Sequence, residues 1–185
     1  RDQAKTINLG LFYGMGKAKL QAELGVSKDK AEELFAIYHQ RVPFVKTLMK
    51  SVSNRAQQRG QIRTLLGRLC RFHLWEPNRF GINKALPFEQ AVQEHGQGNI
   101  RRAYTYKALN KLIQGSAADM TKKSMLDLYK EGIIAHIQIH DELDLSVESP
   151  EQAKKVVEIM ENAVKLDVPN KVDYESGKNW GDIYD

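Results

Sequence analysis

The residues with the most evident chemistry are an imidazole and two carboxylates in succession, His140, Asp141 and Glu142. They lie between two strand-like stretches, so the sequence predicts them at the tip of a hairpin. Acids at such a tip are often simply hydrated. The other interpretation is a divalent cation, because Mg²⁺ prefers hard oxygen ligands and keeps several waters. Asp144 follows at an outward strand position and is expected to be solvated.

A second cluster is the series Arg1, Lys5, Leu9 and Tyr13, which recurs every four residues. In a helix this spacing forms one slowly drifting stripe. Twelve residues of helix separate the basic end from the aromatic end by about 18 Å. Cations suit phosphates and an aromatic ring suits a base or sugar, although a solvated face is the simpler interpretation of the two cations alone.

A third cluster is Tyr106, Asn110 and Gln114, which are also one helical turn apart. These side chains lie on a long predicted helix, just before the small residues 115–118. A polar helix edge is the simplest interpretation of this cluster taken alone.

Composition narrows the class of protein. The 185-residue chain has a net charge of +5 and a pI of about 9.2, which permits a polyanionic partner. Cys70 is the only cysteine, which excludes a disulfide framework and a cysteine-based zinc site and fits a reducing compartment. The apolar runs are too short for a membrane span or signal peptide. We therefore expect a cytoplasmic or nucleoid-associated protein and leave an organellar location open.

The elements that position these clusters follow from periodicity and capping residues. The pattern favours an α+β fold, with helices followed by a small antiparallel sheet that carries helices. A hairpin should turn near Gly67, and residues 75–98 should be irregular apart from a helix over 87–95. The other predicted helices cover 1–12, 28–41, 44–58, 99–131 and 150–166, and the predicted strands cover 133–139, 143–148 and 170–176.

Together, and in this order, the clusters resemble family A DNA polymerases, the class that includes bacterial DNA polymerase I. The family's finger-helix motif resembles RDQAKTINLGLFYG, and its second carboxylate motif resembles QIHDELDLSVE. The stretches QGSAAD and GKNWGDIYD resemble two further parts of the family pattern. The resemblance covers the chain except roughly residues 75–98. It implies part of a right-hand polymerase fold, with helical fingers over 1–60, a hairpin and irregular excursion over 61–98, and a palm with the catalytic hairpin over 99–185.

The resemblance also implies roles for the first helix. Arg1 and Lys5 would bind the triphosphate of the incoming nucleotide, and Lys5 would serve as proton donor or charge stabiliser. Tyr13, followed by Gly14, would occupy the site that the next templating base enters. Leu9 departs from the family's usual Phe or Tyr, so we expect altered discrimination against dideoxynucleotides and a slower incorporation rate.

On the long helix, the resemblance places Asn110 and Gln114 against the minor groove at the primer end. Their amides could test base-pair shape without reading sequence, because every correct pair presents acceptors there. Tyr106 stands where the family often has Arg, which departs from the pattern. Arg101 and Arg102 are expected to contact backbone phosphates on electrostatic grounds.

In the hairpin, the resemblance makes Asp141 a ligand of two catalytic Mg²⁺ ions. Glu142 would shape the catalytic site, and His140 would contact the primer end. The implied function is template-directed DNA synthesis from deoxynucleoside triphosphates on primer-template DNA. The family's other catalytic Asp comes from a strand upstream of the finger helix. We therefore expect an upstream segment or chain as a partner, no membrane partner, and no polymerase activity from this chain alone.

Two alternatives remain open from the sequence. One is a metal-dependent nuclease, which would need further carboxylates near the hairpin, such as Asp119, Asp144 and Glu148. The other is a non-catalytic DNA-binding or assembly subunit. Salt-dependent DNA binding without a metal requirement would favour the second.

Overall fold

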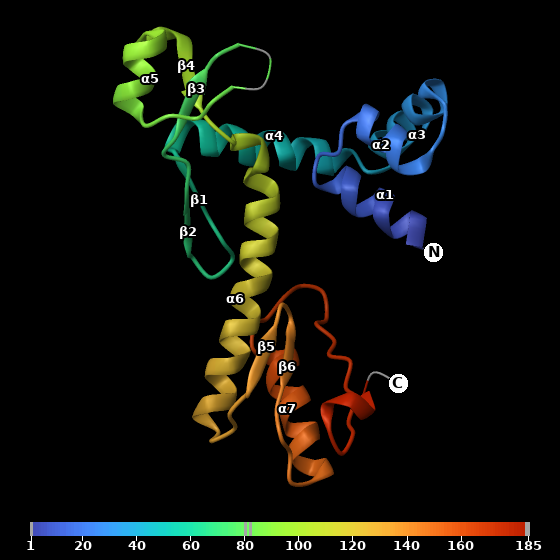
Figure 1. The fold of residues 1–185 in the computed structure, drawn as a ribbon. Helices are drawn as coiled ribbons and strands as arrows, with labels where there is room; N and C mark the ends of the chain where they lie inside the picture. The colour runs from blue at the N-terminus through green and yellow to red at the C-terminus, as the bar shows by residue number, and fades with distance from the viewer. Residues whose placement is uncertain (1, 80, 82, 184–185) are drawn as a thin grey trace. The chain divides into compact units, whose positions relative to one another are not determined.

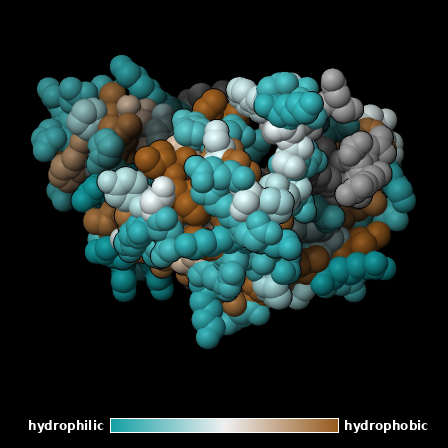
Figure 2. All heavy atoms as spheres, turned by 90° about the horizontal axis from the view of Figure 1, so that it is seen from below, coloured by the Kyte–Doolittle hydropathy of each residue, from teal (hydrophilic) through white to brown (hydrophobic). Residues whose placement is uncertain are grey.

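A computed structural model describes residues 2–79, 81 and 83–183 of the chain. Helices and small antiparallel sheets make up the fold, which confirms the predicted α+β class. The chain divides into two compact units, the first ending at Gly115 and the second beginning at Ser116. No helix in the described part of the chain is long and apolar enough to cross a membrane. Hydrophilic side chains cover most of the face drawn in Figure 2, with hydrophobic patches between them.

Helices dominate the first unit (Figure 1). Ser27 accepts a hydrogen bond from the backbone of Lys30 and so caps one of them, as its sequence position predicts. Gly60 ends another in the left-handed conformation, at φ 66°. The helices are α1 (Asp2–Phe12), α2 (Lys17–Leu24), α3 (Lys28–Arg41), α4 (Pro43–Arg59), α5 (Phe88–His95) and the start of α6 (Ala108–Lys130). Of these, α2 was not predicted.

Two antiparallel hairpins complete the first unit. The strand β1 (Gln61–Arg63) pairs with β2 (Leu69–Arg71), and the turn between them contains Gly67 at φ 89°. The strand β3 (Trp75–Pro77) pairs with β4 (Ile100–Arg102), and α5 and the short 3-10 helix η1 (Gln97–Asn99) lie between them. A second 3-10 helix, η2 (Thr105–Lys107), leads into α6.

The core of the first unit joins α4, the first hairpin and the beginning of α6. These elements contribute one cluster of buried apolar side chains, which fixes the first turns of α6 against α4. The cluster contains Val52, Ala56, Ile62, Phe72, Ala108 and Leu109.

The prediction of one helix over 99–131 is wrong at its start. Ile100–Arg102 form β4 instead, because Trp75–Pro77 supply a pairing partner from far upstream. Tyr104 then takes the left-handed conformation at φ 61°, which interrupts any helix at that point. The α-helix begins only at Ala108.

The second unit contains the remainder of α6, the hairpin of β5 (Ile137–Ile139) and β6 (Glu142–Asp144), and α7 (Pro150–Asn162). Ser149 caps α7 by accepting from the backbone of Gln152, as predicted. Leu128, Ile133 and Val156 form the buried core, against which side chains of β6 and the following residues pack. A short 3-10 helix, η3 (Trp180–Ile183), lies near the C-terminus.

Several predictions for the elements of this unit are wrong. The two strands are shorter than predicted. The first starts later because Ile133, just past the end of α6, is a core residue rather than part of the ladder. The helix α7 ends at Asn162 instead of near residue 166. Residues 170–176 form no strand, and the backbone N–H of Val172 donates instead to the Glu161 carboxylate at 3.2 Å.

Candidate functional site

The acidic cluster lies where the sequence predicts it, at the turn between β5 and β6. His140 has φ 54°, in the left-handed region that few residues other than glycine adopt. Gln138 donates a side-chain hydrogen bond to the His140 carbonyl oxygen at 2.9 Å and so braces the turn. The side chains of His140, Asp141 and Glu142 are all exposed. This turn therefore presents its acids to whatever binds the second unit.

Asp141 and Asp144 differ in their surroundings. Within the described part of the chain, the Asp141 carboxylate makes no ion pair or hydrogen bond. Asp144 is half-buried, and its Oδ2 atom is enclosed without a hydrogen-bond partner among the residues described. The expectation of a solvated Asp144 is therefore wrong: its neighbours Leu143 and Leu145 pack on the core, yet one Asp144 oxygen is still enclosed.

The donor set at the hairpin fits a metal ion only as a partial site. The described residues contain no group of three or more His, Cys, Asp or Glu side chains placed to hold a metal. An exposed, unpaired carboxylate such as that of Asp141 can still supply one hard oxygen to a Mg²⁺ ion that keeps several waters. Asp119, which a nuclease site might have used, is only 7% exposed. The nuclease alternative therefore has no support from the geometry of the hairpin.

The structure describes the side chains of only part of the cluster expected on the first helix. Arg1 and the side chain of Lys5 lie outside the described structure. Leu9 is 48% exposed on α1, so it is available to a ligand rather than held in the core. Tyr13 follows the end of α1, and Gly14 takes φ 87° immediately after it. A Cβ atom at Gly14 would also come within 3.3 Å of the Met49 side chain.

The structure brings two of the predicted clusters into contact. The Gln114 side-chain amide donates a hydrogen bond to the Tyr13 hydroxyl at 3.0 Å, across 101 positions of sequence. Both residues belong to the first unit. Asn110, one turn earlier on α6, is exposed. Neither the spacing of these residues nor their resemblance to the family indicated this contact.

The expected phosphate contacts at Arg101 and Arg102 lie on β4 rather than on a helix. Arg101 is 45% exposed and forms an ion pair with Glu76 at 2.9 Å. Arg102 is half-buried, donates to the Phe72 carbonyl oxygen at 2.9 Å and places its guanidinium 4.5 Å from the Trp75 ring centroid. Arg102 therefore has a structural role in this fold, and Arg101 is the more accessible of the two cations.

Two carboxyls outside these clusters have clearly shifted titration. Donation by the Lys123 ammonium lowers the pKa of Asp127. Hydrogen bonds from the Val172 backbone, and then from Lys171, lower the pKa of Glu161. The first pair lies within α6, four residues apart, whereas the second ties α7 to the segment that follows it. None of the predicted site residues takes part.

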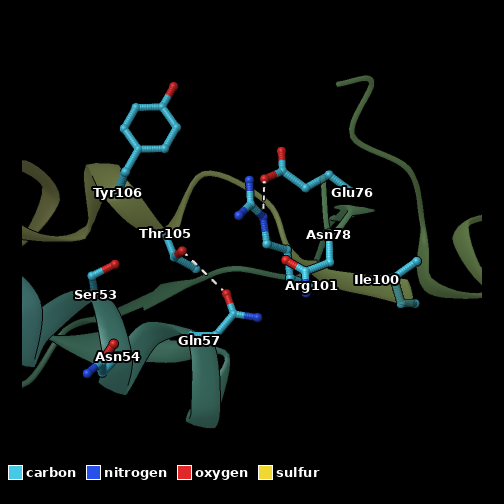
Figure 3. A pocket seen from close by; sticks show the side chains of 9 residues that line it. All are labelled: Ser53, Asn54, Gln57, Glu76, Asn78, Ile100, Arg101, Thr105 and Tyr106. Atoms are coloured by element: carbon cyan, nitrogen blue, oxygen red, sulfur yellow. Dashed lines mark hydrogen bonds and ion pairs between the residues drawn. The ribbon is translucent and has the colours of Figure 1, made fainter. Parts of the chain in front are cut away.

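Sequence reasoning missed a cavity of about 570 Å³ in the first unit, which we call the β3–β4 cavity. Side chains from α4, β3, β4 and η2 line it, and most of them are polar (Figure 3). It lies partly on the irregular stretch that the family resemblance did not cover. Because residues 100–102 were expected to be helical, no pattern in the sequence indicated that these residues would meet.

Comparison with known proteins gives a consistent assignment. Residues 1–182 match the model of DNA polymerase family A. The chain is 37% identical over 191 residues to a DNA polymerase I of Bacillus caldotenax, a match that covers 98% of this chain and 20% of that protein. It is 33% identical over 215 residues to a DNA-directed DNA polymerase of Pseudomonas phage M6, covering 98% of this chain and 29% of the relative.

A solved structure is also similar. It is the POL domain of Pol1 from M. smegmatis in complex with DNA primer-template and dNTP, with a TM-score of 0.69 and 30% sequence identity. The match covers 91% of this chain and 28% of that one. The chain thus spans between a fifth and three tenths of the length of these relatives.

Proposed function

Because the chain belongs to DNA polymerase family A, we propose that it forms part of an enzyme for template-directed DNA synthesis. Its substrates would be primer-template DNA and deoxynucleoside triphosphates, and its reaction the transfer of a nucleotide to the primer 3′ hydroxyl. The similar M. smegmatis structure, which holds DNA primer-template and dNTP, supports these two partners.

The observation that carries the proposal is the hydrogen bond between Tyr13 and Gln114. Tyr13 ends the helix proposed to bind the nucleotide, and Gln114 lies on the helix proposed to face the primer end. In this proposal the side chain that tests the base pair would also hold the aromatic ring at the template slot. Movement of Tyr13 out of that slot would break this bond and free the Gln114 amide for the minor groove.

The first helix would bind the nucleotide through three positions. Arg1 and Lys5, one turn apart, would bind its phosphates, and Lys5 would donate a proton to, or neutralise, the leaving pyrophosphate. Leu9 is exposed one turn further on and would contact the sugar and base. As an aliphatic side chain it offers neither a stacking surface nor a hydroxyl to that sugar.

The long helix and the second strand of the cavity would contact the DNA. The exposed Asn110 amide and the Gln114 amide would donate to acceptors that all correct base pairs share in the minor groove. Arg101 would contact a backbone phosphate if its ion pair with Glu76 opened.

A divalent cation is the cofactor that the family implies, and Asp141 is the residue we propose to hold it. When bound, two such ions would stabilise charge on the transferred phosphate and lower the pKa of the attacking hydroxyl. Asp141 fits this task because its carboxylate is exposed and unpaired in the described structure. Glu142 would shape the turn, and His140 would contact the primer end.

A second catalytic carboxylate would come from a partner segment that adds to the hairpin. Ile137 and Ile139 on β5 are 42% and 37% exposed, although strand residues of this kind usually pack against a neighbour. Within the described structure β5 pairs only with β6, so its other edge is open to a further strand. We propose that an upstream polymerase segment covers this edge and supplies the other Asp.

The test is primer extension by this chain mixed with the upstream part of a related family A polymerase. We expect Mg²⁺-dependent extension by the mixture, none by this chain alone, and none by the mixture with Asp141→Asn. The control is Asp173→Asn, which removes another exposed acid of the second unit and should leave extension intact. Extension that survives Asp141→Asn would refute the role of this carboxylate. Nicking of plasmid DNA without extension would support the nuclease alternative instead.

A further inference from the structure

The β3–β4 cavity contains polar groups that the fold does not use. The Ser53 hydroxyl and the amides of Asn54 and Asn78 line it. Among the residues that the structure describes, none of these three side chains makes a hydrogen bond or ion pair. Ser53 and Asn54 come from α4, whereas Asn78 follows β3 on the far wall (Figure 3). The cavity thus has free donors and acceptors on facing sides.

Other lining groups hold the cavity open rather than fill it. Arg101 and Glu76 form their ion pair at 2.9 Å along one wall. Thr105 donates to the Gln57 amide oxygen at 3.3 Å, as Figure 3 shows. If the Gln57 amide is rotated by 180°, its oxygen instead accepts from the Arg102 backbone N–H at 2.8 Å, and its nitrogen donates to the Arg102 carbonyl oxygen at 3.2 Å. In one orientation Gln57 ties α4 to η2 and in the other to the end of β4, so it braces the cavity walls either way.

An aromatic ring and a cation stand beside these amides. Tyr106 lines the cavity and is 67% exposed, a high value for a large aromatic residue. The Lys107 ammonium lies 5.6 Å from the Tyr106 ring centroid and 5.2 Å from that of Tyr104, which is 40% exposed. Exposed aromatic faces next to cations are typical of surfaces that bind single-stranded nucleic acid, since bases stack and phosphates pair with the charge.

The polar groups that line the cavity favour some kinds of ligand over others. An apolar ligand would leave the amides unpaired, which is costly once water is excluded. A metal ion would find only the Glu76 carboxylate, which Arg101 already neutralises. A nucleobase fits better, because its edge carries both donors and acceptors and an Asn amide can pair with both at once. The volume of about 570 Å³ lies within the range of pockets that hold small molecules.

We propose that the β3–β4 cavity binds one unstacked nucleotide of a single DNA strand. The base would enter the cavity, pair with the amides of Asn54 and Asn78, and stack on Tyr106, while Lys107 would contact the adjoining phosphate. This inference goes beyond the proposed function, because strand binding at this cavity needs neither Asp141 nor nucleotidyl transfer. It would give the enzyme a contact with a strand outside the residues proposed for catalysis.

The experiment measures binding of a fluorescent single-stranded 12-mer to the full chain by anisotropy at one fixed salt concentration. Tyr106→Ala should weaken binding by about 5-fold or more, the range for loss of one stacked base. Tyr106→Phe keeps the ring and should bind like the parent. Asn54→Ala and Asn78→Ala should each weaken binding by about 2- to 10-fold. Tyr129→Ala is the matched control, because Tyr129 is also 67% exposed but belongs to the second unit.

Two further measurements separate a base pocket from general attraction. A strand with 5-iodouracil should crosslink on illumination to Tyr106 or its neighbours on η2, as located by mass spectrometry. A strand of abasic sites should bind the parent and Tyr106→Ala alike, since it has no base to stack. The proposal is overturned if Tyr106→Ala and Tyr129→Ala have equal effects on the normal strand. It is also overturned if crosslinks map elsewhere or the abasic strand binds as tightly as the normal one. Loss of extension with Asp141→Asn leaves these results unchanged, so the two proposals fail separately.

Discussion

The contact between Tyr13 and Gln114 makes a quantitative prediction about the first unit. Tyr13→Phe removes the hydroxyl that accepts the 3.0 Å bond and keeps the ring. Gln114→Met removes the amide and keeps a similar length of side chain. Either change should destabilise the first unit. Once one of the two changes has been made, adding the other should cost nothing further at this contact.

The magnitude follows from the kind of bond and its exposure. A neutral hydrogen bond contributes about 0.5–1.5 kcal/mol net. Gln114 is exposed, so water competes and the lower half of that range is expected. The double variant should therefore show a coupling energy of about 0.5–1 kcal/mol between the two positions. In a complete polymerase, a closing step that breaks the bond should become about 2- to 5-fold more favourable with Tyr13→Phe.

The assay uses the two tryptophans of the chain, one in each unit. In a Trp180→Phe background, Trp75 reports the first unit alone, because its ring lies in β3 beneath a guanidinium that unfolding removes. Urea unfolding followed by Trp75 fluorescence gives the midpoint and slope for the parent, both single variants and the double variant. Tyr129→Phe provides the control, since that tyrosine belongs to the other unit.

The result that would refute the reasoning is additivity. If the two single effects sum to the double within about 0.3 kcal/mol, the residues do not interact in solution. A destabilisation by Tyr129→Phe equal to that by Tyr13→Phe would show that the Trp75 signal does not isolate the first unit.

Three other predictions address the nucleotide site, the backbone and the acid response. Leu9→Phe in a complete polymerase should raise the incorporation rate and change the ratio of dideoxynucleotide to deoxynucleotide use in competitive primer extension, and an unchanged rate and ratio would contradict the proposed sugar contact. Gly60→Ala should lower the melting temperature more than Gly25→Ala. The two glycines have similar φ values of 66° and 62°, but only a Cβ atom at Gly60 would meet a side chain, the Arg102 guanidinium at 2.6 Å. Equal melting temperatures would contradict that clash. Because the pKa of Asp127 is lowered from 3.8 in the folded state, its stabilising effect is present above the unfolded-state pKa and lost as pH falls through the folded-state pKa. Lys123→Met should move that pKa upward in a carbon-13 NMR titration, and an unmoved pKa would assign the shift to another cation.

Local signals in the sequence predicted much of the helical framework. Ser27 and Ser149 stand in sequence just before predicted helices, and both accept the backbone hydrogen bond that a cap requires. Gly67 was read as a turn and takes positive φ there. The helix α2 was missed because it is short and weakly amphipathic, although the left-handed Gly25 at its end was a usable signal.

The errors came from contacts that are distant in sequence. Ile100–Arg102 pair with Trp75–Pro77, and no local pattern in either segment specifies that partner. Tyr104 adopts positive φ without the glycine or asparagine that would have marked it. Propensity alone therefore extended the helix backwards through β4.

In the candidate site, too, the features set by local sequence were predicted and those set by distant contacts were missed. The turn at Asp141 was predicted, because alternating strands around polar residues specify a hairpin locally. The Tyr13–Gln114 contact and the β3–β4 cavity each require packing between segments that lie tens of residues apart. The burial of an Asp144 oxygen was missed because alternation along β6 does not report how a short, two-stranded ribbon twists.

The pairing of β3 with β4 brings together the two ends of the segment between them, residues 78–99, and we call these paired ends the neck of that segment. Trp75 lies opposite Arg102, and the Asn78 N–H donates to the Asn99 carbonyl at 2.6 Å, so both ends of the loop leave the fold side by side. Chain can be added beyond such a neck at little entropic cost, because closure entropy grows only slowly with length. This part of the chain should therefore tolerate added length or a grafted peptide without strain on α4 or α6, as long as residues 75–78 and 99–102 are kept.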